Sequence, residues 1–378
     1  MSSSELMSNT QTGSRESAQA QLTVRLGALA ANYREVLRRA APAAVAPVVK
    51  ANAYGMGLAP VAHALAAAGA DSLFVARVEE GIAVRQLLPQ ARVFVLDGLA
   101  HGTAPALLAY RLIPVLNSLE EAAEWSALAR SERRELDAAL HIDTGMNRSG
   151  FSHTELAQLV ARLRQTLAGI NLVLIMSHLA RADEPDRDMN WVQLARFRAA
   201  LALLPPAPAS FAASAGIELG RDYRFDLVRP GIAIYGGNPL PPRPNPYRTV
   251  AVLTGRVLQV RHIDVGETVG YAANFTAARP SVLVTVAAGY ADGLIRAMAA
   301  KGRAAIAGIY VPFAGRISMD LLALDATEAP EGVAMRGAEV EFLGDTVTLE
   351  EVAEAAGTIT HEILASLGPR AHRVYVDE

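Results

Sequence analysis

Between residues 45 and 236 the sequence alternates eight short apolar runs with longer amphipathic stretches. The apolar runs are predicted to be buried strands, and the longer stretches have helical spacing. The predicted strands are 45–49, 72–76, 92–96, 113–117, 138–143, 171–178, 210–214 and 226–235. The clearest predicted helices are 58–68, 78–88, 119–131, 154–167 and 191–204. This succession predicts an α/β fold with an N-terminal (β/α)8 barrel.

A doubly wound parallel sheet is the alternative for the same alternation of strands and helices. Such a sheet would normally carry a glycine-rich dinucleotide loop, and no GxGxxG motif follows a predicted strand here. The barrel is therefore the better interpretation.

The pattern changes at the proline-rich stretch PLPPRPNP, residues 239–246, which is typical of a linker. Beyond it β-branched runs dominate, and two helical segments follow. These runs are 250–260, 267–275, 282–287, 304–314 and 340–343, and the helices are 349–356 and 361–367. We therefore predict a barrel over 21–240 and a mostly β domain over 241–378. The strand-like segment Gln21–Arg25 could pair with the second domain.

Composition narrows the class of function. The hydrophobic share of 51% allows a large core, while a net charge of -3 without a basic block argues against nucleic-acid binding. The absence of cysteine excludes disulfides and thiolate sites. No apolar stretch has the length of a membrane span. The first 20 residues are rich in Ser, Thr and Gln without an apolar signal core, so we expect a disordered tail and a cytoplasmic enzyme.

Lysine usage points to one position in the predicted barrel. The chain has only two lysines, Lys50 and Lys301, although Lys and Arg together number 35. Lys50 ends the first predicted strand. Lysine forms imines with carbonyl compounds, including pyridoxal phosphate (PLP), whereas arginine keeps its proton and cannot. Lys50 is thus a candidate Schiff-base residue, and a surface lysine reached by drift is the alternative.

Polar residues also end other predicted strands, where a βα barrel places its active residues. They are Arg148, His178, Ser214 and Arg229. Each has a structural alternative. Arg148 could form an ion pair with Asp143, and His178 could be a histidine of the core. Ser214 could cap a helix, and Arg229 could anchor its strand end by an ion pair. Together they occupy one rim of the inferred barrel.

The last two predicted strands carry a plausible phosphate site, as is usual for this architecture. Ser214 opens a short segment whose free N–H groups can face an anion. Gly231 follows the last strand and permits close approach of the backbone. A phosphate here and a lysine after the first strand suit a phosphorylated aldehyde cofactor.

These residues carry a resemblance to a known family. VKANAYGMG at 49–57 closely resembles the PLP-attachment signature of the alanine racemase family. Six further segments match in order: DTGMNR at 143–148, SH at 177–178, RPGI at 229–232, VGY at 269–271, GYADG at 289–293 and GRISMD at 315–320. The match covers nearly the whole chain after residue 20.

The resemblance implies a PLP-dependent enzyme that interconverts L- and D-alanine, with a homodimer in which each site is completed by the partner's C-terminal domain. The implied cofactor-binding residues are Lys50, Tyr54, His178, Ser214, Arg229, Gly231 and Ile232. Arg148 and the Met319 backbone would contact the substrate carboxylate. Lys50 and Tyr271 of the partner subunit would be the two catalytic bases. No nucleic acid, membrane or metal ion is expected.

Chemistry supports these roles. Racemisation removes a proton from one face of Cα and returns one to the other, so one base per face suffices. A phenolic hydroxyl acts as a base near neutral pH when positive charge is close by. Arg229 is permanently charged and cannot protonate a pyridine nitrogen, which should suppress transamination.

Two positions depart from the family pattern. Many members have, at the position of His141, a carbamylated lysine that holds the arginine corresponding to Arg148. We expect a neutral His141 here, with a bound halide or a nearby carboxylate such as Asp143 satisfying Arg148. A further phosphate-binding tyrosine near the C-terminus is also missing from 366–373.

Other functions fit the residues less well. A broader amino-acid racemase on the same scaffold is the nearest alternative. A fold-related PLP decarboxylase leaves the Tyr271 and Met319 segments unexplained, and a non-catalytic PLP carrier leaves the second domain unexplained. A metal-dependent barrel hydrolase lacks an HxH or HExxH motif.

Overall fold

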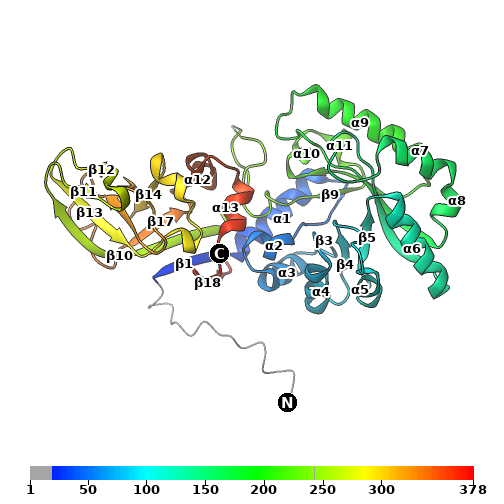
Figure 1. Ribbon diagram of the computed structural model, residues 1–378, viewed down its shortest axis with the longest axis horizontal. Helices are drawn as coiled ribbons and strands as arrows, with labels where there is room; N and C mark the ends of the chain where they lie inside the picture. Colours follow the sequence, from blue (N-terminus) through cyan, green and yellow to red (C-terminus); the bar gives the residue numbers. More distant parts are fainter. Residues whose placement is uncertain (1–18, 242) are drawn as a thin grey trace, which may run out of the picture. The chain divides into compact units, whose positions relative to one another are not determined.

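The computed structural model describes residues 19–241 and 243–378 (Figure 1). They form two compact units. One comprises residues 26–248, and the other comprises 249–378 together with residues 19–25. The predicted disordered tail lies outside the described residues except for its last two positions, and Ala20 already begins a strand.

The first unit is built on an eight-stranded parallel sheet in the order β2-β9-β8-β7-β6-β5-β4-β3. Its strands are β2 (Ala44–Val45), β3 (Ser72–Val75), β4 (Arg92–Val95), β5 (Ile113–Leu116), β6 (Leu136–His141), β7 (Ile170–Met176), β8 (Ala209–Ala213) and β9 (Leu227–Arg229). The two edges meet, because Val48 forms a parallel bridge with Phe74. The predicted barrel is therefore confirmed.

Two barrel strands are much shorter than predicted, and proline explains both differences. β2 ends at Val45, just before Ala46-Pro47, although single backbone hydrogen bonds to Val228, Pro230 and Phe74 continue beyond it. β9 ends at Arg229 because Pro230 has no N–H for the ladder. The residues up to 235, predicted as strand, instead form turns.

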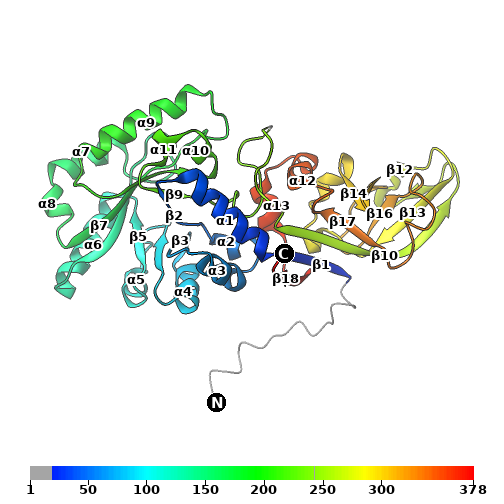
Figure 2. The same cartoon turned by 180° about the vertical axis from the view of Figure 1, so that it is seen from behind.

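Helices follow the strands around the barrel (Figure 1). They are α1 (Leu26–Ala40), α2 (Lys50–Tyr54), α3 (Leu58–Ala67), α4 (Val78–Leu87), α5 (Ala104–Ala109), α6 (Leu119–Glu132), α7 (His153–Ala161), α8 (Leu163–Thr166), α9 (Asp188–Leu201), α10 (Ser214–Glu218) and α11 (Arg221–Arg224). All five predicted helices are present, although the one predicted at 154–167 is divided into α7 and α8. α1 was not predicted; it packs on β2 through a buried face that includes Leu29 and Val36 (Figure 2).

Side chains of adjacent strands fill the barrel with large aromatic residues. Phe74 of β3 stacks on Phe94 of β4 with ring centroids 4.6 Å apart, and both are buried. Burial of one such side chain contributes about 1.5–3 kcal/mol. This packing gives the strand ends a rigid base for a site at the rim.

The second unit is mostly β, as predicted. Its strands are β1 (Ala20–Arg25), β10 (Ala251–Ile263), β11 (Thr268–Val269), β12 (Phe275–Thr276), β13 (Ser281–Val286), β14 (Arg303–Ile306), β15 (Ile309–Pro312), β16 (Leu322–Asp325), β17 (Glu339–Leu343) and β18 (His372–Val376). The helices are η1 (Tyr271–Ala273), η2 (Tyr290–Asp292), η3 (Arg296–Ala300), α12 (Leu349–Ala356) and α13 (Thr360–Ser366). β1 pairs antiparallel with β10 and parallel with β18.

Two runs predicted as single strands in this unit are hairpins. The run at 304–314 turns at Ala307 and Gly308, which have φ of 49° and 80°, so β14 and β15 pair antiparallel. Two successive residues with positive φ are typical of the tight turns that join twisted strands. The run at 267–275 turns between β11 and β12, where Gly270 has φ of 73°.

No helix in the described part of the chain has the length and apolar character needed to cross a membrane.

Candidate active site

Lys50 lies at the carboxyl end of the β2 segment and begins a turn of left-handed backbone. Ala51, Asn52, Ala53 and Tyr54 have φ between 53° and 54°. Left-handed residues other than glycine cost roughly 1–2 kcal/mol each, and four in a row are rare. Strain of this kind persists where contacts impose it, most often at functional sites. The lysine predicted from the sequence is therefore attached to the most strained backbone turn of the barrel rim.

Tyr54, at the end of this turn, lies against the loop that follows β9. Its ring stacks on Tyr235 with centroids 4.5 Å apart, and both rings are buried. A Cβ added to Gly231 would come within 2.2 Å of the Tyr54 Oη, so only glycine fits there. Burial raises the pKa of Tyr54 to about 12, which keeps the hydroxyl protonated as a donor.

Ser214 belongs to the same corner of the rim. Its Oγ accepts the Gly231 N–H at 3.0 Å and the Ala233 N–H at 3.3 Å. The serine therefore does not act as a helix cap. The Gly231 N–H is thus already engaged, and the donors left at this corner are the hydroxyls of Tyr54 and Ser214 and the N–H of the neighbouring Ile232, which suit a phosphate group.

Arg229 ends β9 and is buried. Its Nη2 donates to the Ser177 carbonyl at 2.7 Å and lies 3.3 Å from the His178 Nδ1, while its Nη1 donates to the Ser210 Oγ. These partners are neutral, and no ion pair of Arg229 occurs in the described chain. Burial lowers the pKa of Arg229 to about 9, so it still carries its charge at neutral pH.

The guanidinium of Arg229 has N–H donors that these contacts do not use. A guanidinium has five N–H groups, and the contacts with Ser177, Ser210 and His178 use three. His178 beside it is neutral, because burial, together with the nearby charges of Arg229 and Arg148, lowers its pKa to about 3. A buried cation with free donors and neutral neighbours suits a ligand atom that only accepts hydrogen bonds.

His141, at the end of β6, is buried and held in one tautomer. Asn117 donates from Nδ2 to the carbonyls of Leu96 and Val115, so its Oδ1 must be the atom that faces His141 at 2.8 Å. The His141 Nδ1 therefore carries the hydrogen. Burial and the charge of Arg229 lower the pKa of His141 to about 4, which makes it neutral as expected.

Arg148 follows β6 in an exposed loop and makes no hydrogen bond or ion pair within the described residues. Asp143, its nearest acidic residue in sequence, is used differently. Its carboxylate accepts the N–H groups of Gly145, Met146 and Asn147 at 2.9–3.2 Å. The suggested ion pair between Asp143 and Arg148 is therefore absent, and Arg148 remains available.

The rim has a consistent electrostatic character. Lys50, Arg148 and Arg229 all lie close enough to lower the pKa of His178. The acidic residue beside them, Asp143, accepts hydrogen bonds from three loop amides. An anionic ligand, such as a phosphate or a carboxylate, is therefore favoured at this mouth.

In the second unit, three of the predicted segments converge. The Tyr290 N–H donates to the Ser318 carbonyl, and the Ala291 N–H donates to the Met319 carbonyl, both at 3.1 Å. A Cβ added to Gly315 would come within 2.9 Å of the Val269 carbonyl oxygen, so 269–271 lies beside the same turn. Tyr271 is 72% exposed and Met319 is 51% exposed.

Arg370 holds this cluster together. It donates from Nε and Nη2 to both oxygens of the buried Asp292, at 2.8 and 2.6 Å, and it pairs with Asp320. Its Nη2 also reaches the Met319 carbonyl at 3.3 Å. The Met319 carbonyl is thereby fixed, and its amide is left for another partner.

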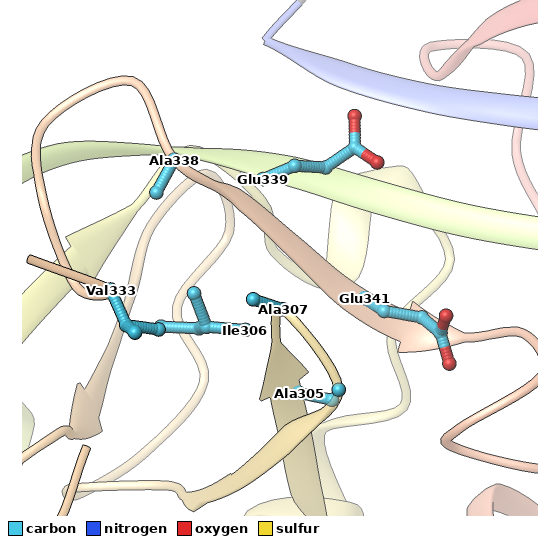
Figure 3. Close-up of a pocket in the computed structure, with 8 residues that line it drawn as sticks. Ala305, Ile306, Ala307, Val333, Ala338, Glu339 and Glu341 are labelled. Carbon is cyan, nitrogen blue, oxygen red and sulfur yellow. The ribbon is translucent and has the colours of Figure 1, made fainter. Parts of the chain in front are cut away.

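A pocket of the second unit is a weaker candidate. It has a volume of about 300 Å3 and lies around β14 and β17 (Figure 3). Its polar side chains are Glu339 and Glu341, and Glu341 already accepts the backbone N–H groups of Thr346 and Val347. It contains none of the predicted site residues.

Comparison with known proteins identifies the family. The profile of the alanine racemase N-terminal domain matches residues 24–239, and that of the C-terminal domain matches residues 250–375. The chain belongs to the alanine racemase family. A catabolic alanine racemase of Agrobacterium fabrum is 47% identical over 95% of this chain and 92% of its own. An alanine racemase of Methylobacterium nodulans is 46% identical, over 95% and 96% respectively.

Solved alanine racemases share the structure as well. The crystal structure of alanine racemase from Bartonella henselae, which has covalently bound pyridoxal phosphate, matches with a TM-score of 0.92 and 39% identity. The match covers 95% of this chain and all of that chain. The biosynthetic enzyme of Pseudomonas aeruginosa matches with a TM-score of 0.88 and 35% identity, over 95% of this chain and 99% of the other.

The residues present fit the cofactor of the family, PLP. The Tyr54 and Ser214 hydroxyls and the Ile232 N–H offer donors for a phosphate, and Gly231, which has no Cβ, lets the Tyr54 hydroxyl lie in this corner. The spare donors of Arg229 fit a pyridine nitrogen, which accepts hydrogen bonds. Lys50, on the same rim, supplies the amine.

Several residues of this alanine racemase site escaped the sequence analysis. Asn117 fixes the tautomer of His141, Tyr235 stacks on Tyr54, and the buried Gln193 binds the carbonyl of His178 at 3.0 Å. Glu80 accepts the N–H next to Lys50. None of these residues belongs to a motif. Only Asn117 could have been found from the sequence, because it is a polar residue at the end of a predicted strand.

Proposed function

We propose that this enzyme racemises alanine with PLP, and that Lys50 and Tyr271 of the partner subunit act as its two bases. The observation that carries the proposal is that two functional groups belong to the same barrel rim. One is the amine of Lys50, which begins a strained turn, and the other is the buried guanidinium of Arg229, whose partners are neutral. The family relationship agrees with this assignment.

PLP would be held at both ends by residues of the barrel. Lys50 would bind it covalently, Tyr54, Ser214, Gly231 and Ile232 would bind its phosphate, and His178 would lie against its ring. When bound, the cofactor draws electrons from the substrate and makes the Cα proton removable. Arg229 would donate a hydrogen bond to the ring nitrogen without transferring a proton, because its guanidinium stays charged.

The substrate carboxylate would be bound by Arg148 and by the Met319 amide of the partner subunit. Arg148 is exposed and has no ion-pair partner in the described chain, so it can accept a carboxylate. The Met319 turn is held by Arg370 and Ala291 through its carbonyl, so its amide can donate outward. Two-point binding would fix Cα between the bases.

The proton transfers would take place on opposite faces of Cα. The Lys50 amine would serve one face, and the hydroxyl of Tyr271 of the partner subunit would serve the other. Racemisation requires both, since a proton removed from one face must be replaced on the other. For L- to D-alanine one base accepts and the other donates, and the roles exchange in the reverse direction.

The shared site would require a homodimer. Tyr271, Tyr290 and Met319 form an exposed group in the second unit, with exposed fractions of 72%, 43% and 51%. Exposed aromatic and apolar groups of this kind often mark an interface. A cytoplasmic location is part of the same proposal.

The test combines activity with cofactor mapping. Purified protein supplied with L-alanine should form D-alanine, and with D-alanine it should form L-alanine, approaching equal amounts. Borohydride reduction followed by peptide mapping should place a pyridoxyl group on the peptide that contains Lys50. Labelling at Lys301 instead, or racemisation that persists in a Lys50→Ala variant, would refute the assignment. Serine as a second substrate distinguishes a broader racemase.

A further inference from the structure

The backbone next to Lys50 is held by a side chain from another strand–helix unit. Glu80, in the first turn of α4, accepts the Ala51 N–H with Oε1 at 2.6 Å. Its Oε2 accepts the N–H groups of Ala76 and Arg77 at 2.9 and 3.2 Å. One carboxylate thus joins the turn that follows Lys50 to the end of β3.

This contact acts on the peptide from which Lys50 projects. The peptide unit between Lys50 and Ala51 is planar, so a hydrogen bond to the Ala51 N–H fixes the orientation of that unit. The Cα of Lys50 belongs to it. The orientation in which the lysine side chain leaves the backbone is therefore tied to Glu80.

The turn needs such a contact because its own sequence does not favour it. Ala51 is the first of four left-handed residues, and neither alanine nor tyrosine favours that conformation. The far end of the turn is held by Asn52, whose Oδ1 accepts the Leu58 N–H at 2.8 Å. Glu80 is the corresponding side-chain contact at the near end.

A carboxylate suits this place better than other acceptors. Both oxygens of Glu80 face N–H donors, so an amide in its place would turn an NH2 group toward one of them. Aspartate is one methylene shorter. It can still accept from the start of its own helix, but it cannot also span the gap to Ala51.

We infer that Glu80 is a positioning residue that holds Lys50 for proton transfer. The inference rests on the proposed function of Lys50. It assigns Glu80 no contact with the substrate. Its loss should therefore slow the chemical step and leave the binding of the substrate carboxylate by Arg148 almost unchanged.

The test compares Glu80→Gln and Glu80→Asp with a control, Glu79→Gln. Glu79 is the exposed neighbour in the same helical turn and makes no hydrogen bond within the described residues, so it reports the effect of charge at the start of α4. For each holoenzyme, kcat and KM for L-alanine and the hydrogen exchange of the peptide 50–58 are measured.

Both Glu80 variants should lower kcat by about tenfold to a hundredfold, because small displacements of a catalytic group have effects of this size. Their KM should stay within about twofold of the parent value. The peptide 50–58 should exchange faster in both, and Glu79→Gln should behave like the parent. Glu80→Asp keeps the charge and the helix cap, so it remains informative if Glu80→Gln folds poorly.

Two outcomes would overturn the inference: parental kcat and exchange in both Glu80 variants, or an equal loss in Glu79→Gln. A parent protein without racemase activity, or without a label on Lys50, would count against the proposed function instead. Hydrogen exchange of 50–58 would then decide whether Glu80 holds this turn.

Discussion

Replacement of Gly231 by alanine tests the phosphate corner most directly. The added Cβ would lie 2.2 Å from the Tyr54 Oη, which is 1.2 Å closer than the 3.4 Å at which ordinary contact begins. Tyr54 cannot swing aside freely, because it is buried and stacked on Tyr235. The φ of Gly231 is not positive, so the clash, and not backbone strain, would cause the effect.

The clash should displace the Tyr54 hydroxyl by about 1 Å, the size of the overlap, or shift the loop after β9. Overpacking of this kind costs about 1–3 kcal/mol. If most of that cost falls on the bound state, the affinity for PLP should fall by about fivefold to a hundredfold. The dissociation constant can be measured by titrating cofactor-free protein with PLP and following the absorbance of the complex.

A double-mutant cycle gives the control. In Tyr54→Phe the Oη is gone, and the nearest ring atom to the added Cβ is Cζ at 3.0 Å, so most of the clash disappears. We expect Tyr54→Phe to weaken PLP binding by about tenfold through loss of one donor to a charged group. The double variant should then bind almost as well as Tyr54→Phe alone. Parental affinity in Gly231→Ala, or full additivity of the two changes, would refute this account of the corner.

Three further predictions concern the dimer, the histidines and the arginine. Inactive Lys50→Ala and Tyr271→Phe subunits should regain activity when mixed and allowed to exchange, since one site of the heterodimer has both bases; exchange without recovery would argue that each chain supplies its own. Burial lowers the pKa of His141 to about 4 and of His178 to about 3, so both take up a proton on unfolding below pH 6.5. The free energy of unfolding should therefore be fully retained above pH 6.5 and should fall as the pH drops towards 4, by up to roughly 1.4 kcal/mol per pH unit for each histidine. Urea titrations at several pH values should show a smaller dependence of this free energy on pH in His141→Asn. A parental free energy that does not change with pH would contradict the assignment. Because Asp143 does not pair with Arg148, we expect a halide beside Arg148, and a crystal grown with bromide should show anomalous density there; a direct carboxylate pair without such density would exclude the halide.

Much of this protein could be predicted from patterns that are local in the sequence. The alternation of apolar runs with helical spacing indicated the barrel, since each run is long enough to be a buried strand. Polar residues at the ends of those runs, such as Lys50 and Arg229, must share a rim because parallel strands end on the same side. The family motifs depend on the same local signals.

Local patterns also explain where the predictions were wrong. Alternation cannot distinguish one long strand from a hairpin, so the run at 304–314 was predicted as a single strand, although Gly308 marks its turn. The short strands β16 and β18 gain their pairing from β13 and β1, which are distant in sequence. Their own four or five residues give too weak a signal.

The finer arrangement of the site was decided by the tertiary structure. The intrinsic preferences of Ala51, Ala53 and Tyr54 oppose a left-handed turn, and the turn exists because contacts such as that of Glu80 outweigh those preferences. The tautomer of His141 depends on Asn117, whose amide is oriented by the Leu96 carbonyl after β4 and by the Val115 carbonyl of its own strand, β5. The sequence alone determined which chemical groups stand at the barrel rim. Only the folded chain determined their protonation, tautomer and direction, because these depend on burial and on neighbours that lie far away in the sequence.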